Sequence, residues 1–253
     1  MATALMIRPL LMATGLLAAA SAFAQASDTD PARDPKRTEV WTPVPAVVAT
    51  PVGKPPSDAI VLFDGKDVSA WESEQGGRVP WTVADGAMTV VPGSKGIRTR
   101  QRFCDVQLHV EWRTPTDTQG FDGQNRGNSG IFLQERYELQ VLDSYHNPTY
   151  ANGQAGSLYK QAMPLVNASR APGQWQAYDI LWKAPRFSAG GGLVSPARIT
   201  VLHNGVLVQD DTVLAGKTEY IGAPSYAPHG CEPLYLQEHD SRVSYRNIWV
   251  REL

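Results

Sequence analysis

Polar and apolar residues alternate with a period of two through much of the chain, which is the pattern of half-buried β-strands. The clearest case is Asn128–Asp143, where two extended segments meet at Gln134–Arg136. Successive side chains of a strand point to opposite faces, so Glu138 and Gln140 share one face of the second segment. Burying such groups unpaired costs roughly 2–7 kcal/mol, so we expect a polar floor on a sheet or a solvent-facing surface. The opposite face is apolar and should face the core: Tyr137, Leu139 and Val141.

Other segments predict further strands. Trp81–Val91 turns at Asp85-Gly86 and Ala197–Gln209 turns at Asn204-Gly205, and both pairs accept the positive φ of tight hairpin turns. The alternation in Arg102–Arg113 predicts one long strand whose apolar side faces the core. About a dozen such segments, with turn residues between them and no helical apolar stripe of useful length, predict an all-β sandwich or jelly roll.

The first residues have the features of an export signal. Arg8 is followed by the short apolar run Leu10–Ala20 and by Ala22–Ala24, which has the small-x-small form of a cleavage site. We therefore expect a periplasmic or secreted protein that begins near Gln25. The Pro- and Ala-rich stretch that follows is expected to be a leader or linker. The chain is accordingly divided into a signal peptide, a leader and one β domain: residues 1–24, 25–57 and 58–253.

Composition narrows the function classes. The formal net charge of −2 gives no basic signature, so a nucleic-acid partner is disfavoured. No stretch reaches the ~20 apolar residues that a membrane span needs. No phosphate-binding glycine loop or zinc-ligand spacing is present. Cys104 and Cys231 form either a disulfide, which an oxidising compartment permits, or two free thiols.

The candidate chemistry lies on strand faces and in one long loop. In a curved sandwich, a concave face with carboxylates, amides and aromatic platforms commonly holds a sugar. Three segments have polar groups at alternate positions: Gln107, His109 and Glu111; Glu138 and Gln140; Gln237 and His239. The aromatic platforms are expected to be Tyr145, Tyr150, Tyr159 and Trp182.

An ordinary glycosidase mechanism is disfavoured by the residues themselves. The run Glu138-x-Gln140-x-x-Asp143 is similar to the acidic strand of sandwich-fold endoglucanases, in which two carboxylates act as nucleophile and acid. Here Gln140 stands in place of the middle acid. Asp143 falls on the opposite face of the strand unless a bulge intervenes, and it has the alternative role of anchoring the next loop.

An ordered set of motifs resembles one known family, the 3-keto-disaccharide hydrolase domain family, over residues 58–253. The resemblance implies a concanavalin A-like jelly-roll fold. The set is far more specific than any single motif. It comprises Leu62-Phe-Asp-Gly-Lys66, Asn128-Ser-Gly-Ile131, Tyr137-Glu-Leu-Gln-Val-Leu-Asp143, Pro172-Gly-Gln-Trp175, Tyr178-Asp-Ile180, His203-Asn-Gly-Val206, Leu236-Gln-Glu-His239 and Arg246-Asn-Ile-Trp249.

The resemblance implies cleavage of 3-keto-glycosides rather than of ordinary glycosides. A ketone at C3 makes the C2 proton acidic, so a base can remove it, the C1 aglycone leaves by β-elimination, and water then adds. We expect Glu138 or His239 to act as base or acid. Gln140 and Gln237 are expected to donate to sugar oxygens, and Tyr159 or Lys160 to contact the enolate or the leaving oxygen. The remaining residues expected to bind substrate are His109, Glu111, Asp143, Tyr145 and Trp182.

Several alternatives stay open at this stage. His239 is either a site residue or a packed strand histidine, and His109 has a structural or surface role as its alternative. A divalent ion is a further option, with Glu138, Asp143 and His239 as conceivable ligands. Where the family has Gly after this histidine, the chain has Asp240-Ser-Arg242, which bears on substrate choice. The same fold also suits a noncatalytic carbohydrate-binding module or a structural envelope domain.

Overall fold

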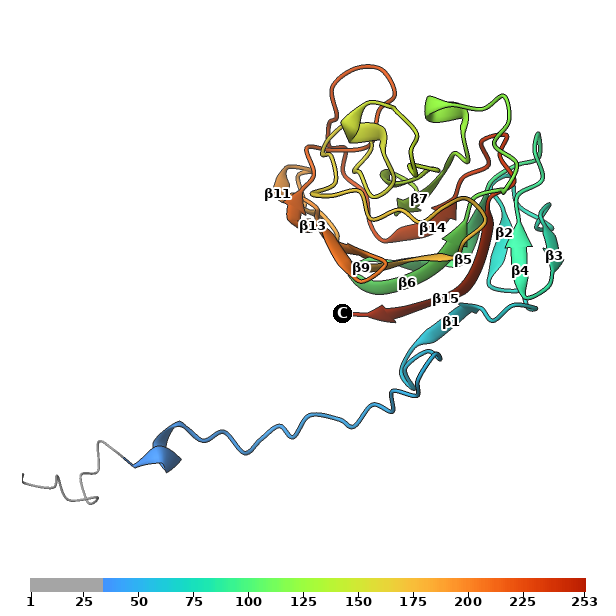
Figure 1. The fold of residues 1–253 in the computed structure, drawn as a ribbon. Helices are drawn as coiled ribbons and strands as arrows, with labels where there is room; N and C mark the ends of the chain where they lie inside the picture. The colour runs from blue at the N-terminus through green and yellow to red at the C-terminus, as the bar shows by residue number, and fades with distance from the viewer. Residues whose placement is uncertain (1–33) are drawn as a thin grey trace, which may run out of the picture. The chain divides into compact units, whose positions relative to one another are not determined.

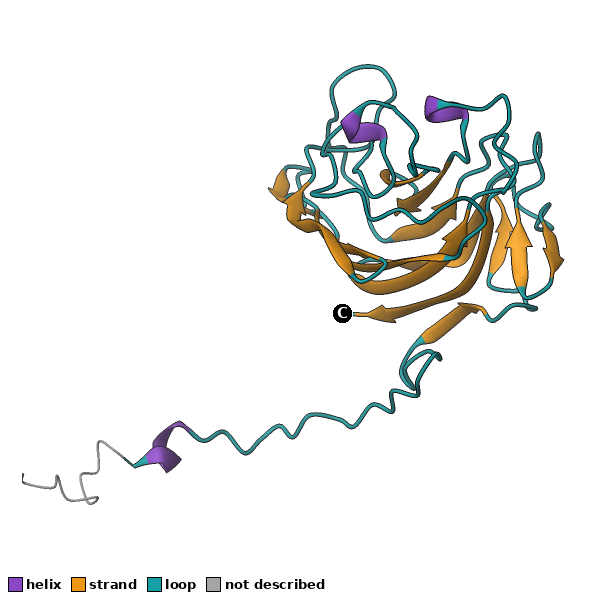
Figure 2. Ribbon diagram, viewed as in Figure 1, coloured by secondary structure: helices purple, strands orange, loops and turns teal. Residues whose placement is uncertain are grey.

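Segments of alternating polarity form antiparallel sheets in the computed structural model, which describes residues 34–253. The architecture is a jelly-roll β-sandwich, confirming the expected fold class (Figures 1 and 2). The chain divides into two units, Met1–Val47 and Val48–Leu253. The expected signal peptide lies outside the described residues. Within the part of the chain that is described, no helix is long and apolar enough to cross a membrane.

The larger sheet has eight strands. Its path runs β13-β12-β9-β6-β15-β4-β3, and β1 pairs with β15 beside that path. The strand bounds, in chain order, are β1 Ile60–Phe63, β3 Thr82–Ala84, β4 Ala87–Thr89, β6 Val106–Arg113, β9 Gln176–Lys183, β12 Arg198–His203, β13 Val206–Val213 and β15 Ser244–Glu252.

The smaller sheet has five strands in the order β2-β5-β14-β7-β8, and a separate two-stranded sheet joins β10 to β11. The bounds are β2 Trp71–Ser73, β5 Ile97–Phe103, β7 Ser129–Leu133, β8 Tyr137–Val141, β10 Arg186–Phe187, β11 Leu193–Ser195 and β14 Glu232–Leu236. The helical elements among the described residues are short 3-10 turns: η2 Pro35–Thr38, η3 Gly123–Asn125 and η4 Ala151–Gly153.

One apolar core joins the two main sheets. Figure 1 shows β9, β6 and β15 stacked against β5, β14 and β7. Tyr137 on β8 packs on Trp182 on β9, with ring centroids 5.1 Å apart. The Tyr178 hydroxyl, also on β9, donates to the backbone oxygen of Gln140 at 2.8 Å. The apolar faces of the alternating strands therefore meet, and their polar faces point outward on opposite sides of the sandwich.

The predicted hairpins are confirmed. β3 and β4 turn at Asp85-Gly86, and β12 and β13 turn at Asn204-Gly205, with positive φ at all four residues. β7 and β8 likewise meet at Gln134–Arg136, where Gln134 and Glu135 have positive φ. These turns set the register that sends Glu138 and Gln140 away from the core.

The single strand expected over Arg102–Arg113 is wrong. β5 ends at Phe103 and β6 begins at Val106, and the two strands belong to different sheets. At this crossing Cys104 forms a disulfide with Cys231, which settles the choice between a bridge and two thiols. Alternation alone did not show the crossing, because both strands place apolar residues toward the same core.

The outer face of the eight-stranded sheet holds a network around His109 on β6. His109 Nδ1 lies 2.6 Å from an Asp179 oxygen, and its Nε2 lies 3.7 Å from a Glu111 oxygen. Glu111 also accepts hydrogen bonds from Arg246 at 2.6 Å and Asn247 at 2.8 Å. Desolvation opposes the charge of the imidazole, but its two carboxylate partners outweigh it and raise the pKa of His109 to about 9. Pairing with His109 is the main cause that lowers the pKa of Glu111 to about 2.

This network predicts a pH-dependent stability. The His109 contribution should be complete below its ordinary pKa of 6.5 and disappear as pH rises through about 9. The Glu111 contribution should be complete above its ordinary pKa of 4.5 and disappear as pH falls through about 2. We expect His109→Gln to lower the free energy of unfolding near pH 6 by about 1 kcal/mol, a Tm change of about 2–4 °C. Calorimetry across pH checks this, with the exposed His146→Gln as control; a Tm difference that persists above pH 9 would contradict it.

Candidate active site

A pocket of about 470 Å³ lies on the outer face of the five-stranded sheet. Loops that carry η3 and η4, and the loop before β14, gather over β7 on this side of the sandwich (Figures 1 and 2). Its volume is within the range of small-molecule sites. The lining residues combine amides, tyrosines, one carboxylate and one imidazole: Gln124, Asn125, Asn128, Phe132, Glu138, Gln140, Tyr150, Tyr159, Thr218, Tyr220, Gln237 and His239.

Glu138 is the carboxylate at the floor of this pocket. Its side chain comes from β8, and only 6% of the residue is exposed. Among the described residues, no side chain or backbone group forms a hydrogen bond or an ion pair with its carboxyl group. Burial raises the pKa of Glu138 to about 8, because ionisation there is not offset by a cation or a donor. At neutral pH most of this carboxyl is protonated, and it ionises readily just above.

Gly130 on β7 makes the space that the Glu138 carboxyl occupies. It pairs with Gln140 of β8, the position diagonal to Glu138. A Cβ at Gly130 would lie 2.8 Å from Glu138 Oε1 and 2.8 Å from Phe132 Cε2. Any larger residue would therefore displace the carboxyl or the ring. The glycine of the Asn128-Ser-Gly motif is therefore required for a steric reason, since it leaves room for the Glu138 carboxyl at the floor of the pocket.

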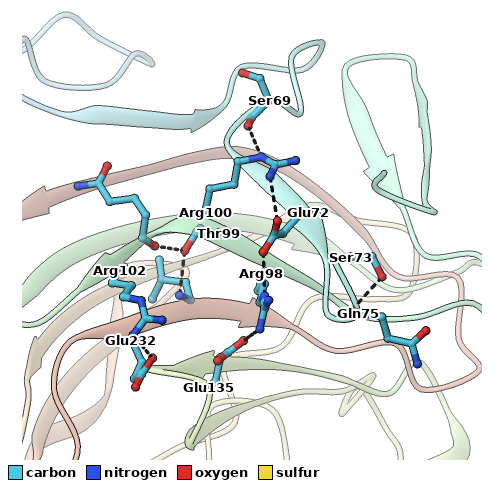
Figure 3. Close-up of polar contacts among 12 residues, drawn as sticks. Ser69, Glu72, Ser73, Gln75, Arg98, Thr99, Arg100, Arg102, Glu135 and Glu232 are labelled. Atoms are coloured by element: carbon cyan, nitrogen blue, oxygen red, sulfur yellow. Dashed lines mark hydrogen bonds and ion pairs between the residues drawn. The ribbon is translucent and has the colours of Figure 1, made fainter. Parts of the chain in front are cut away.

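Other carboxylates on the same sheet face are neutralised, unlike Glu138. Cross-strand register places Glu72, Arg98, Tyr235, Phe132 and Glu138 in one row across the five strands. Arg98 bonds Glu72 at 3.1 Å and Glu135 at 3.5 Å (Figure 3). Tyr235 and Phe132 separate this charged end of the row from Glu138. The row therefore keeps cations away from the buried carboxyl and preserves its raised pKa.

Two tyrosines stand beside Glu138. Segment 156–159 pairs with the edge of β8, and the Tyr159 backbone N–H donates to the backbone oxygen of Glu138 at 3.2 Å. The Tyr159 and Tyr150 hydroxyls lie 2.6 Å apart and share a hydrogen bond. Burial is the main cause that raises the pKa of Tyr159 above its usual range, so this hydroxyl stays protonated and can donate.

The amides of the pocket form a partly satisfied chain. Gln140 donates to the Asn128 side-chain oxygen at 3.0 Å, and Asn128 donates to the Gln124 backbone oxygen at 2.8 Å. Three side-chain oxygens in the same wall are buried without a partner: those of Gln124, Gln140 and Gln237. An unpaired buried acceptor costs about 1–3 kcal/mol, so these oxygens are suited to accept hydrogen bonds from a bound ligand or from water.

His239 follows β14 and is exposed at the rim of the pocket. Its chain position depends on Gln237, whose backbone N–H donates to the Gly130 oxygen at 2.9 Å. Glu238 then accepts from the backbone of Gly93 and Asp240, which shapes the turn around His239. No described residue bonds to the His239 imidazole. The alternative of a packed strand histidine is therefore wrong, and the imidazole is free to meet a ligand.

Comparison with known proteins shows the family to which the chain belongs. Residues 58–251 match the 3-keto-alpha-glucoside-1,2-lyase-like domain family. The chain belongs to this family. A crystal structure of a candidate glycosyl hydrolase from Parabacteroides distasonis is 52% identical, with a TM-score of 0.82 over 86% of this chain and 96% of that chain.

A second candidate glycosyl hydrolase of P. distasonis shares the fold at 22% identity, with a TM-score of 0.57 over 78% of this chain and 94% of that chain. None of the curated proteins compared with the chain matches it. The family membership confirms the resemblance carried by the sequence motifs.

Three residues that were expected to bind substrate lie away from the pocket. Trp182 is fully buried in the core against Tyr137, so it offers no platform to a sugar. His109 and Glu111 are on the outer face of the other sheet, in the network described above. The alternation of β6 does expose them, but the crossing between sheets sends that face to the opposite side of the sandwich.

Asp143, Tyr145 and Lys160 lie near the pocket without lining it. Asp143 is buried and pairs with Arg126 at 2.8 Å, and one of its oxygens accepts from the Tyr145 backbone, the loop-anchoring role considered above. Lys160 donates to the Tyr220 backbone oxygen at 2.6 Å and lies 4.1 Å above the centroid of that ring. Its ammonium therefore contacts Tyr220, a residue of the pocket wall.

The conceivable metal ligands Glu138, Asp143 and His239 do not come together. Glu138 and His239 line the pocket, but Asp143 does not. Among the described residues, no group of three His, Cys, Asp or Glu side chains could hold a metal ion. The acidic and imidazole donors present here do not fit the metal site considered from the sequence.

Sequence reasoning missed several lining residues. Thr218 and Tyr220 come from a Pro- and Gly-rich region without periodicity, and Gln124 and Asn125 from a loop rich in Gly, Asp and Gln. Thr218 accepts from the Glu138 backbone N–H at 2.9 Å, which ties the two segments together. The motif Asn128-Ser-Gly was a usable signal for Asn128, whereas the loop residues had none.

The buried carboxyl predicts a measurable cost to stability. The pKa of Glu138 is raised from 4.5 to about 8 in the folded state. The protonated carboxyl therefore costs no stability below pH 4.5, and the cost grows as pH rises and is complete above about pH 8. We expect the neutral variant Glu138→Gln to unfold about 2–4 °C higher than wild type above pH 8, and the gain to shrink toward pH 5. Calorimetry across pH measures this. Glu135→Gln, which loses an ion pair on the same sheet face, should show no such gain; equal behaviour of the two variants would contradict the assignment.

Proposed function

We propose that the chain cleaves 3-keto-glycosides by elimination across C1 and C2, followed by addition of water. Family membership and the 52%-identical candidate glycosyl hydrolase support a glycosidase-type enzyme acting on glycosides. One observation carries the finer proposal. Glu138 is the one carboxyl group among the described residues that line the pocket, it is buried among amides and tyrosines, and its pKa is raised to about 8. A base poised near neutral pH suits removal of a carbon-bound proton that a neighbouring ketone has acidified.

The proposed reaction has two stages, elimination of the aglycone and addition of water. The Glu138 carboxylate takes the C2 proton, and the electrons of that C–H bond form an enolate with the C3 ketone. The enolate then re-forms the C3 carbonyl and a C1–C2 double bond as the C1–O bond breaks, and the leaving oxygen receives a proton. Water adds its oxygen to C1 and a proton to C2, which yields the free 3-keto-sugar.

The other residues have roles that follow from their chemistry. His239, exposed and unpartnered at the rim, is assigned as the acid for the leaving oxygen. The protonated Tyr159 hydroxyl, held by Tyr150, is assigned as a donor to the enolate oxygen. Gln140 and Gln237 are assigned to the sugar hydroxyls, because their buried side-chain oxygens lack partners.

A retaining or inverting glycosidase mechanism fits the pocket less well. Both mechanisms require two carboxyl groups on either side of the scissile bond. Among the described residues that line the pocket, Glu138 is the one carboxylate. Elimination requires a single base at C2, so it matches the carboxylate count of the site.

We also propose that the enzyme works outside the cytoplasm. The export-type N-terminus supports this location. The Cys104–Cys231 disulfide also supports it, because structural disulfides persist in oxidising compartments.

The first test is turnover of a 3-keto-glucoside with a chromogenic aglycone beside the unoxidised glucoside. We expect release only from the keto substrate, and an unchanged rate with chelator. Glu138→Gln should lower kcat/KM by about 10²-fold or more and His239→Ala by a smaller factor, the range typical of general acid–base groups. Glu135→Gln serves as the matched control. Full turnover by both site variants would contradict the assignment, and sugar binding without any release would favour a noncatalytic carbohydrate-binding module.

The second test addresses proton removal from C2. The base must be ionised, so below about pH 8 kcat/KM should rise about tenfold per pH unit. A substrate deuterated at C2 should react more slowly than the protiated one, because the C2–H bond breaks before or during loss of the aglycone. The rate is measured from aglycone release under single-turnover conditions. If both isotopologues react at the same rate and the hydrogen on C2 does not exchange with solvent, removal of the C2 proton is excluded.

A further inference from the structure

A second pocket of about 300 Å³ adjoins the sugar pocket and has no role in the reaction as described so far. Its walls come from the same two segments. Residues 124, 125 and 128 line the sugar pocket, whereas Arg126 and Gly127 line the second one. Likewise residues 237 and 239 line the first pocket and 240–242 the second. We call the second cavity the side pocket.

The position of the side pocket corresponds to the leaving-group side of the reaction. His239, assigned as the acid for the leaving oxygen, directly precedes Asp240, which lines the side pocket. The protonated oxygen links C1 to the aglycone, so the aglycone must extend past the acid. Gly127 has a φ of +65°, and a Cβ there would lie 2.7 Å from Thr114 Cγ2, so the backbone between the two pockets is held in one path.

The side pocket combines an apolar part with charged and hydroxyl side chains, which are Asp117, Thr118, Arg126, Asp143, Asp240, Ser241 and Arg242. Phe121, Pro92 and Pro115 give it an apolar surface. Phe121 is 51% exposed and lines the side pocket, so its ring is accessible to a ligand bound there. The three tyrosines and the amide chain of the sugar pocket have no counterpart here.

The charges of the side pocket largely cancel. Arg126 pairs with the buried Asp143 at 2.8 Å, so neither is free to bind an ion. Arg242 and Asp240 add one charge of each sign, and Asp117 remains as the one uncompensated carboxylate. The lining therefore carries one negative charge in excess, which disfavours an anionic occupant.

We propose that the side pocket receives the leaving group and favours an uncharged aromatic aglycone, whose ring contacts Phe121. This inference rests on the elimination reaction proposed above. It makes Phe121 a residue that determines substrate choice, not a catalytic one. It also gives a role to Asp240, Ser241 and Arg242, because these residues form part of the wall.

The experiment compares phenyl, methyl and glucosyl 3-keto-glucosides of the same anomeric configuration. Phenol is intrinsically the better leaving group, so the readout is the ratio of phenyl to methyl kcat/KM in each variant, divided by the wild-type ratio. We expect Phe121→Ala to reduce this ratio about tenfold, equivalent to about 1.4 kcal/mol, and the methyl substrate to stay within about twofold. Phe121→Tyr should restore the wild-type ratio, and the exposed Leu193→Ala, on β11, should leave it unchanged.

Two results would overturn the inference while turnover of methyl 3-keto-glucoside sustains the proposed function. Phe121→Ala could leave the ratio unchanged, whether or not both kcat/KM values fall, or it could lower kcat/KM for the glucosyl substrate more than for the phenyl one. Wild-type protein that releases nothing from any of the three keto substrates would overturn the proposed function, and the inference with it.

Discussion

The site depends on one costly arrangement, a carboxyl group buried on the outer face of a sheet with no partner among residues 34–253. Glu138 is nearly inaccessible, and desolvation raises its pKa to about 8. An arginine within ion-pair distance would lower that pKa and stabilise the fold, but it would also remove the proposed base from the range in which it could take a carbon-bound proton at moderate pH. The proposed function therefore gives a reason for a feature that folding alone disfavours.

The rest of the five-stranded sheet is built so that this arrangement persists. Arg98 and its carboxylate partners occupy the far end of the same row, with two aromatic rings between them and Glu138. Gly130 gives the carboxyl its space, and segment 156–159 covers the edge of β8 while bringing in Tyr159. The stability lost at Glu138 is offset elsewhere by the apolar core, the Cys104–Cys231 bridge and the network around His109.

The two outer faces of the sandwich show how similar residues acquire different roles. His109 and Glu111 are a histidine and a carboxylate on one strand, close enough to fix each other's charge. His239 and Glu138 are the same pair of residue types, but no described partner neutralises either of them. The first pair is part of a stabilising network, while the second remains available for proton transfer. Contacts, rather than residue type, separate the two pairs.

Period-two alternation, together with Gly-containing turn pairs, was enough to predict an all-β sandwich, the hairpins and the outward face of Glu138 and Gln140. These are local properties, because a strand's side-chain period and a turn's positive φ depend on neighbouring residues. The motifs also placed Gln237 and His239 in the site before their geometry was known.

Only the tertiary structure decided which polar faces share a side. β5 and β6 separate into different sheets at Cys104, so His109 and Glu111 lie opposite the pocket and Trp182 lies inside the core. The loops that supply Thr218 and Tyr220 lack periodicity, and the missing partner of Glu138 is a property of everything packed around it. Sequence determined the strands and the reactive residue types, whereas burial and cross-sheet pairing determined which of them form a site.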